Sequence, residues 1–166
     1  MDLQQAATYW QTKDQTAIHM DRSALLAEAE RFIKAHNTCA LGTGWGTRVR
    51  CTPIEYTYWK GRFWMLSEGG KKFLSLAHNL QVSLAIYDAF ATFQDLGGMQ
   101  VDGTAVLVEP WTEEYCALLQ HKKIPESALR GLDHPMYLIC VQPAHIDFLC
   151  GAWKEKGFSS RQALDF

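Results

Sequence analysis

Hydroxyl and basic side chains gather between positions 48 and 79, where two extended runs lead into the sequence SEGGKKF. The run before it has strand composition, Gly69 and Gly70 loosen the backbone, and residues 71–78 carry apolar side chains at helical spacing. Because the start of a helix already has a positive dipole end, Lys71 and Lys72 there suit an anion held between their ammonium groups and free amides. The pattern predicts an anion-binding corner. An ordinary strand-to-helix turn with two solvated lysines explains the same residues equally well.

Composition narrows the classes of function that need to be considered. The 166 residues are 48% hydrophobic and 20% charged, with a formal net charge of −2, which indicates one folded domain and not a polyanion-binding protein. The chain has no apolar run of membrane-spanning length, and its first residues lack the basic and apolar regions of a secretion signal. We therefore expect a cytoplasmic protein that binds neither nucleic acid nor membrane.

Cysteine and histidine usage argues against a metal centre. The five cysteines are odd in number, widely spaced and set mostly in apolar runs, so they are expected to be buried free thiols. The sequence contains neither a CxxC pair nor an HExxH pattern, and its six histidines are scattered. No metal site is predicted.

The chain begins helical and continues mainly as strands. Residues 4–11 are compatible with a helix, and Asp21 or Ser23 can cap a clearer one that reaches Lys34. Seven runs rich in β-branched and aromatic residues follow from Thr38. They are TCALGTG, RVRCTPIEYTYW, GRFWML, QVSLAIYD, MQVDGTAVLVE, MYLICVQ and HIDFLC.

Short turn signals separate these strands, including Gly97-Gly98 and a turn at Pro143 before the last run. A helical interlude, residues 111–119 and 125–131, is expected to pack across one end. Because strands and helices do not alternate, the pattern favours an antiparallel closed or partly closed barrel over a parallel sheet. We predict a mainly β protein with flanking helices in a single domain: a helical segment 1–36, a barrel 37–150 with helical insertions, and a tail 151–166.

In this order the motifs RVRCTPIEY, FWMLSEGGKKF, LAHNLQVSLAIYD and GMQVDGTA resemble the pyridoxamine 5'-phosphate oxidase-like flavoproteins over residues 32–149. Their fold is the FMN-binding split barrel. The opening TYWQTKD, the run HPMYLICVQP and the terminal GFSSRQALDF are similar to a compact bacterial subgroup, and nitroimidazole-reductase-like relatives share the fold and size. The resemblance implies a homodimer with two FMN sites at the subunit interface, each built from both chains.

The site residues are carried over from this resemblance by motif. Arg50, with Arg48 on the same face of the strand, would lie beside the flavin and its phosphate. Backbone at Cys51, Thr52 and Pro53 would face the ring edge. The remaining cofactor-binding candidates are Ser67, Glu68, Lys71 and Lys72 at the phosphate, Gln100 at the flavin, and Trp153 as a stacking residue. Two lysines stand where the oxidase itself has arginine then lysine, so charge is kept and bidentate contact is lost.

Each candidate also has a structural interpretation. Arg48 and Arg50 could be edge-strand charges that discourage aggregation. Cys51 could be either a thiol activated by Arg50 or a packed strand residue. Asn79 is better explained as a helix cap than as a ligand. His134 and His145, at the ends of the expected last hairpin, are typical of backbone-bonding histidines, and Arg161 of an interface ion pair.

The function that follows is an FMN-dependent oxidoreductase or reductase acting on a small molecule, with NAD(P)H a candidate electron donor. It is not expected to be pyridoxamine phosphate oxidase itself, because the tail lacks that enzyme's arginine- and tryptophan-bearing segment. One alternative is a binding module that holds flavin, haem or a deazaflavin without turnover. The other is a cofactor-free dimeric interaction protein, in which Lys71 and Lys72 are surface charges.

Overall fold

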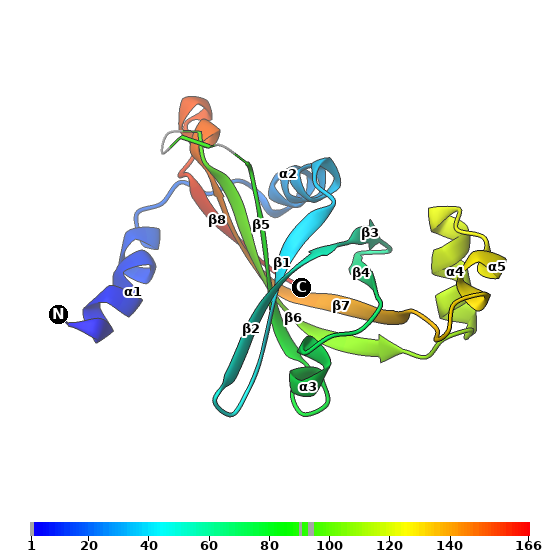
Figure 1. The fold of residues 1–166 in the computed structure, drawn as a ribbon. Helices are drawn as coiled ribbons and strands as arrows, with labels where there is room; N and C mark the ends of the chain where they lie inside the picture. The colour runs from blue at the N-terminus through cyan, green and yellow to red at the C-terminus, as the bar shows by residue number, and fades with distance from the viewer. Residues whose placement is uncertain (1, 90, 93–94) are drawn as a thin grey trace.

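The fold is an antiparallel sheet curled into a half-barrel, seen in a computed structural model that describes residues 2–89, 91–92 and 95–166 (Figure 1). Seven strands follow the order β2-β1-β5-β6-β7-β4-β3, and β8 pairs with β7. The strands are β1 (Thr38–Trp45), β2 (Arg48–Glu55), β3 (Thr57–Trp59), β4 (Arg62–Ser67), β5 (Gln81–Tyr87), β6 (Gly97–Val108), β7 (Tyr137–Cys150) and β8 (Arg161–Asp165). The helices are α1 (Leu3–Asp14), α2 (Arg22–Ala35), α3 (Lys72–Leu76), α4 (Glu113–Lys122), α5 (Glu126–Arg130) and the 3-10 helix η1 (Gly151–Lys156). The predicted mainly β split barrel with flanking helices is confirmed.

Alternation along the strands builds the barrel interior. In β1 the side chains at 39, 41 and 43 are buried while their neighbours are partly exposed, and β5 and β6 alternate in the same way. Since successive strand residues point to opposite faces, one face of the sheet lines the core and the other faces outward. The interior contains Leu41, Phe63, Leu84, Val101 and Val141, none of which has accessible surface.

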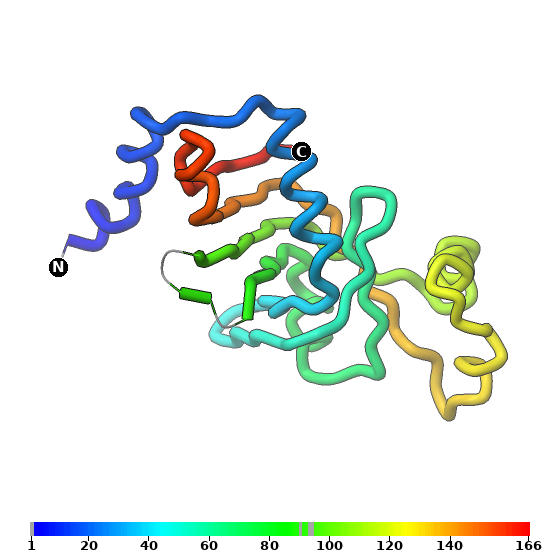
Figure 2. The backbone as a smooth tube through the Cα atoms, turned by 90° about the horizontal axis from the view of Figure 1, so that it is seen from above, coloured from blue at the N-terminus to red at the C-terminus, as the bar shows by residue number. Residues whose placement is uncertain are grey.

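Helix α2 closes one end of the barrel, as Figure 2 shows from above. The side chain of Asp21 accepts hydrogen bonds from the amides of Ser23 and Ala24, so the predicted cap is confirmed at Asp21. Leu25, Ala29 and Ile33 on its inner face join the barrel core. Helix α3 lies at the opposite end of the barrel (Figure 1).

Helix α1 stands apart from the barrel, and none of its residues is buried (Figures 1 and 2). Among the helices of the described chain, none is both long and apolar enough to cross a membrane. The tail returns to the body as β8, which was not predicted. Gln162 fixes it there: the side chain accepts from the amide of Met20 at 3.1 Å and donates to the carbonyl of Ile18 at 3.1 Å.

Two expected turns are wrong. Gly97 and Gly98 belong to β6, and the runs on either side of Pro143 form one continuous strand, β7, instead of a hairpin. The register of β6 against β7 shifts at Asp102/Gly103, opposite Pro143. Between the partners of Asp102 and Gly103, β7 has one extra residue, Ala144, so the bulge lies in β7 beside the proline. A proline has no amide to donate to a ladder, and the bulge accommodates that gap without ending the strand.

Helices α4 and α5 do not close an end of the barrel but cover the outer side of β4, β6 and β7. There Trp64, Leu138 and Cys140 pack against Tyr115 and Leu118 to form a second, smaller core. The predicted helical interlude is therefore present at residues 113–130, and it buries the apolar side chains on this part of the outer face.

Candidate anion-binding corner

The corner begins on the inner face of the β1–β2 hairpin. Arg50 lies opposite Thr43, and Arg48 lies opposite Trp45, so all four side chains share the face that leads into the barrel. Helix α3 packs against the same two strands, and the Asn79 amide after it donates to the carbonyl of Gly44 at 2.8 Å. Thr52, one step deeper than Arg50, is on this face as well.

The loop after β4 forms the second wall. Ser67 is buried, and its hydroxyl accepts from the amide of Gly69 at 3.1 Å and donates to the carbonyl of the same residue at 3.1 Å. Gly69 and Gly70 have φ values of 136° and 109°, which L-residues rarely adopt. The backbone conformation thus requires the glycine pair. The Ser67 hydroxyl, which the resemblance assigned to a phosphate, instead forms hydrogen bonds within the loop.

Lys72 is the central cation of the corner. Only 6% of its surface is exposed, and its ammonium group donates to the carbonyl of Gly69. Burial lowers the pKa of Lys72, and the positive charge of Arg50 lowers this pKa further. The two cations come from neighbouring elements, since α3 packs against β2.

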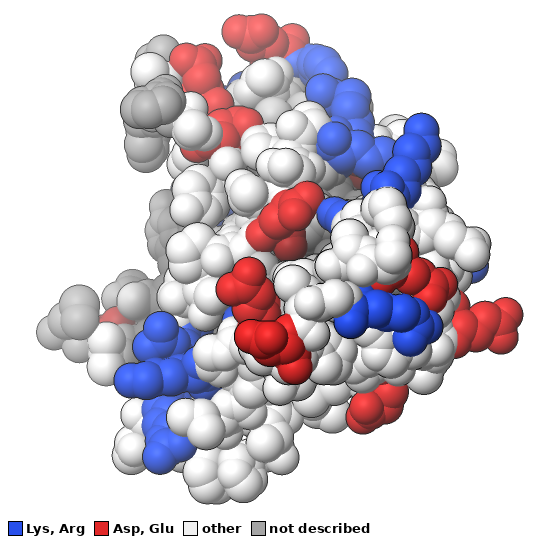
Figure 3. All heavy atoms as spheres, turned by 45° about the vertical axis from the view of Figure 1, so that its right-hand side comes forward, with Lys and Arg blue, Asp and Glu red and all other residues white. Residues whose placement is uncertain are grey.

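Arg48, Arg50, Lys71 and Lys72 have no carboxylate oxygen within 4.0 Å anywhere in the described residues. Most other basic side chains of the barrel are paired, as Arg62 is with Glu114 and Lys122 with Glu55. Figure 3 shows blue side chains gathered at the lower end of the molecule, over the β1–β2 hairpin and α3. Glu68, the acidic residue of this segment, is exposed and forms no such pair in the described chain.

A buried hydroxyl without a partner lies in the same corner. Thr43 is 3% exposed, and its Oγ1 has no hydrogen-bond partner among the described residues. A buried polar atom that lacks a partner costs about 1 to 3 kcal/mol, so such atoms are rare unless something else satisfies them. Oxygen atoms of a phosphate would meet both needs, because they accept from the hydroxyl and neutralise the cations. The residues present therefore fit a phosphate-bearing group.

Helix α3 contributes less positive charge to the corner through its dipole than the sequence suggests. Instead of reaching from Lys71 to His78, α3 spans only Lys72–Leu76, with Lys71 at its N-cap position and no side-chain cap. A single turn has little dipole, so the charge of the corner comes from side chains. Asn79 is not the cap residue either; its side chain links the end of this segment to β1 and to the amide of Gln81.

Three other predicted residues lie on the outer face of the sheet. Cross-strand partners share a face of the sheet, and the pairs Gln100–Ala85, Ala85–Ala40 and Ala40–Pro53 link four neighbouring strands. Gln100 and Pro53 therefore lie on the same face. Gln100 is exposed, while Met99 and Val101 beside it are buried in the core. Cys51 is on the outer face with Pro53 and is exposed, not buried as predicted from the apolar context of the cysteines. Within one chain, the corner and Gln100 point to opposite sides of the sheet.

The placement of Trp153 disagrees with its predicted role. It follows β7 in η1, is 1% exposed and packs edge-on against Phe148 with ring centroids 4.6 Å apart. Both the burial and the position, at the end of the barrel away from α3, leave it no ring face for a cofactor in the corner (Figure 1). Trp153 is a core residue here.

Comparison with known proteins identifies the fold. No family model and no curated protein matches the chain. Among solved structures, a FAD-binding protein from Mesorhizobium loti superposes with a TM-score of 0.62 at 15% identity, covering 84% of this chain and 94% of that one. A candidate pyridoxamine 5'-phosphate oxidase from Listeria innocua gives a TM-score of 0.59 at 16% identity, with 75% and 98% covered. The chain has the pyridoxamine 5'-phosphate oxidase-like split-barrel fold.

The same split barrel also occurs in haem proteins. HutZ, the haem storage protein of Vibrio cholerae, gives a TM-score of 0.59 at 20% identity, with 70% of this chain and 88% of that one covered. At these identities the likeness shows the fold alone, and fold does not fix function. The choice between ligands therefore depends on the residues of the corner.

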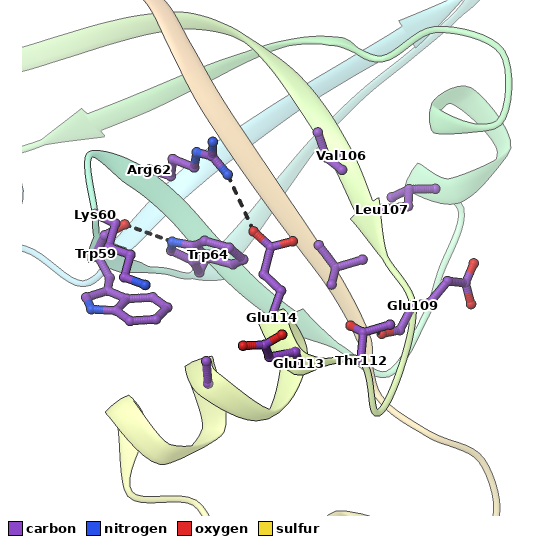
Figure 4. A pocket seen from close by; sticks show the side chains of 12 residues that line it. Trp59, Lys60, Arg62, Trp64, Val106, Leu107, Glu109, Thr112, Glu113 and Glu114 are labelled. Atoms are coloured by element: carbon purple, nitrogen blue, oxygen red, sulfur yellow. Dashed lines mark hydrogen bonds and ion pairs between the residues drawn. The ribbon is translucent and has the colours of Figure 1, made fainter.

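A groove of about 720 Å³ lies elsewhere on the molecule, between the β3–β4 hairpin and α4 (Figure 4). Two of its polar groups have partners: Arg62 pairs with Glu114 at 3.4 Å, and the indole of Trp64 donates to the carbonyl of Trp59 at 2.9 Å. One face of Trp59 stacks on His121. None of the predicted cofactor-binding residues lines this groove.

Sequence reasoning missed three residues of the split-barrel corner. Thr43 and Trp45 continue the inner-face alternation of β1, and His78 stacks on Trp45 with centroids 3.8 Å apart. The alternation from Cys39 and Leu41 was visible in the sequence, and extending it would have placed Thr43 inside. In the described residues no group of three or more His, Cys, Asp or Glu side chains is arranged for a metal ion.

Proposed function

We propose that this protein is a flavoprotein that binds FMN through the corner formed by Arg48, Arg50, Lys71 and Lys72, and that it acts as an oxidoreductase on a small molecule. The observation that carries the proposal is a set of four cations without carboxylate partners in the described chain, on β2 and at the start of α3, which packs against β1 and β2, together with the buried, unpartnered Thr43 hydroxyl opposite Arg50. A phosphate monoester with two negative charges suits that combination better than a neutral ligand does.

The protein's own part in such chemistry is to bind and orient the cofactor. Arg50 and Lys72 would hold the phosphate, and the Gly69-Gly70 backbone would leave room for its approach because neither residue has a Cβ. The flavin would supply the hydride and electron transfer, so the chain need not provide a general base. The support from known structures is a shared fold with a FAD-binding protein and an oxidase candidate.

We further propose that the site is completed by a second copy of the chain. The corner and Gln100 lie on opposite faces of the sheet, so one flavin can contact both types of residue only if two chains share it. The outer face between them supports close approach, since it carries the small residues Gly42, Ser83 and Ala85. A homodimer with two equivalent sites satisfies these requirements.

The alternative function is a binding module that holds a flavin, a haem or a deazaflavin without turnover. It is favoured by the haem storage protein with the same fold. The corner argues against haem, whose two propionates would suit the cations but whose iron needs an axial ligand. The nearest histidine, His78, already stacks on Trp45. A deazaflavin with a phosphate would use the same cations as FMN.

The first experiment is the absorption spectrum of the purified protein, with the mass of any chromophore released by heat. It is followed by FMN titration of the Lys71→Ala/Lys72→Ala double variant. Losing two charge-assisted contacts of about 1.5 to 3 kcal/mol each should weaken FMN at least about tenfold.

Lys154→Ala/Lys156→Ala removes the same charge from η1 and serves as the matched control, and circular dichroism confirms that both variants fold. Unchanged FMN affinity in the first variant would overturn the assignment of the corner. A haem Soret band in the purified protein would replace the flavin with the alternative ligand.

A further inference from the structure

We infer that the corner continues into an aromatic subsite, built from Trp45 and His78, which accepts the adenine of a flavin adenine dinucleotide. This inference rests on the proposed flavin site and extends it from a mononucleotide to a dinucleotide. The feature that leads to it is the stacked pair of Trp45 and His78 beside the turn of the β1–β2 hairpin, with ring centroids 3.8 Å apart and planes 15° from parallel.

Trp45 is positioned by its register. It lies opposite Arg48, two residues beyond Thr43 on the same face of β1. Two strand residues span about 7 Å, so the indole lies one pleat further out than the buried hydroxyl at which a first phosphate would bind. A nucleotide chain that starts at Thr43 and Arg50 and runs outward would pass Arg48 and reach Trp45.

The cations divide in the same direction. Lys72 is buried, and Arg50 lies opposite the buried Thr43, whereas Arg48 lies one pleat further out, opposite Trp45. Arg48, Arg50 and Lys71 are exposed. A first phosphate at Thr43 would use Arg50 and Lys72. Arg48 and Lys71 are then left for a second phosphate. The two linked phosphates of a dinucleotide match two successive pairs of cations better than a single terminal phosphate does.

The ring of Trp45 is available for a third aromatic group. His78 covers one face, 45% of the residue is exposed, and within the described chain no other aromatic ring or cation stacks on it. An exposed indole held in place by a neighbouring ring is a ready surface for a purine, because every nucleobase offers a π face. Asn79 keeps this arrangement in place through its bond to Gly44.

The test compares FAD, FMN and ADP by isothermal titration calorimetry on the wild type and on Trp45→Leu. A stacked base contributes a factor of about ten or more to affinity. We therefore expect the wild type to prefer FAD over FMN by about tenfold, and ADP to compete with FAD. In Trp45→Leu the preference should vanish while FMN affinity stays within about twofold of wild type.

Trp10→Leu is the matched control, since Trp10 is equally exposed but lies on α1, and it should keep the preference. His78→Ala, which removes the supporting ring, should reduce the preference in part. Equal affinity of the wild type for FMN and FAD, or a FAD preference that survives Trp45→Leu, would overturn the subsite and leave the proposed FMN site standing. Failure of the wild type to bind any flavin would instead overturn the proposed function.

Discussion

Arg50 and Lys72 come from different elements, β2 and α3, yet the charge of the arginine lowers the pKa of the lysine, to which burial adds the larger effect. Two cations held near each other without a carboxylate oxygen within 4.0 Å in the described chain destabilise the fold unless an anion joins them. We propose that a bound anion joins these two cations, which would make its binding sensitive to pH.

Flavin affinity should fall at alkaline pH. A bound phosphate raises the pKa of Lys72, so binding favours the protonated lysine and is weakened as pH rises through the lowered pKa of the free protein, below its ordinary value of about 10.4. Lys72→Arg keeps its charge throughout this range and should show no such fall. Fluorescence titration with FMN from pH 7 to pH 10 distinguishes the two proteins, because ionisation of the flavin itself affects both equally. Identical pH profiles would show that Lys72 does not meet the phosphate.

The proposed dimeric site predicts complementation between two defective chains. Arg50→Gln and Gln100→Ala should each weaken FMN binding when present alone. If each site combines the corner of one chain with Gln100 of the other, a mixed dimer contains one site with both defects and one intact site. Mixing the two variants after partial unfolding should restore FMN binding of wild-type affinity at up to one site per mixed dimer. Should mixtures bind no better than the separate variants, Gln100 and Arg50 would not serve one shared site.

Much of this fold was predictable because alternation and helix caps are local signals. The strands up to β6 and helix α2 follow directly from them. The hairpin expected at Pro143 was wrong because a proline normally interrupts a ladder, whereas here a bulge at Ala144 lets β7 continue, and that bulge is defined only by the pairing of β7 with β6. Strand β8 was missed because its five residues gain their stability from Gln162 and β7, not from composition.

The site was predictable to the same extent. Lys71 and Lys72 were singled out by charge beside a glycine pair, and Arg48 and Arg50 by the family resemblance; in the structure α3 packs against β2, the strand that carries the two arginines. The Ser67 hydroxyl is already bonded to Gly69, and Trp153 is in the core, because hydrogen bonding and burial depend on contacts that a motif does not contain. Thr43 could not be singled out from a motif, because what marks it is a buried hydroxyl that has no hydrogen-bond partner among the described residues.

Gly103 lies where the β6–β7 register shifts, and it should not tolerate a side chain. A Cβ at this position would lie 2.5 Å from the carbonyl oxygen of Gln142 and 2.9 Å from a methyl group of Val141, and the backbone oxygen cannot move without breaking the β6–β7 ladder. We expect Gly103→Ala to lower the free energy of unfolding by about 2 to 3 kcal/mol, measured by urea denaturation. Gly131→Ala is the control: its Cβ would meet the nearest atom at 3.6 Å, an ordinary contact, and its stability should change by less than about 0.5 kcal/mol.

The hydroxyl of Tyr56 should contribute measurably to stability. It is buried and donates to the carbonyl of Ile33 at 2.7 Å, which joins the end of α2 to the strand region. Tyr56→Phe leaves that carbonyl without its donor and should cost about 1 to 2 kcal/mol in thermal or urea unfolding. Tyr9→Phe, on the exposed face of α1, should have no effect. Equal stabilities of the two variants would mean that water reaches the carbonyl of Ile33.

Stability should also depend on His145 near neutral pH. Its ring bonds to Asp165 at 2.7 Å, and this contact raises the pKa of His145, with smaller contributions from Asp147 and Asp102. Because the folded-state pKa lies above the unfolded value of about 6.5, the stabilisation is complete below that value and is lost as pH rises through the folded-state pKa. The free energy of unfolding of the wild type should therefore decrease from about pH 6 upward, and His145→Gln should remove this slope. His134→Gln, whose ring contacts only the Pro135 carbonyl at 3.5 Å in the described chain, should keep it. A slope that persists in His145→Gln would assign the pH dependence to another group.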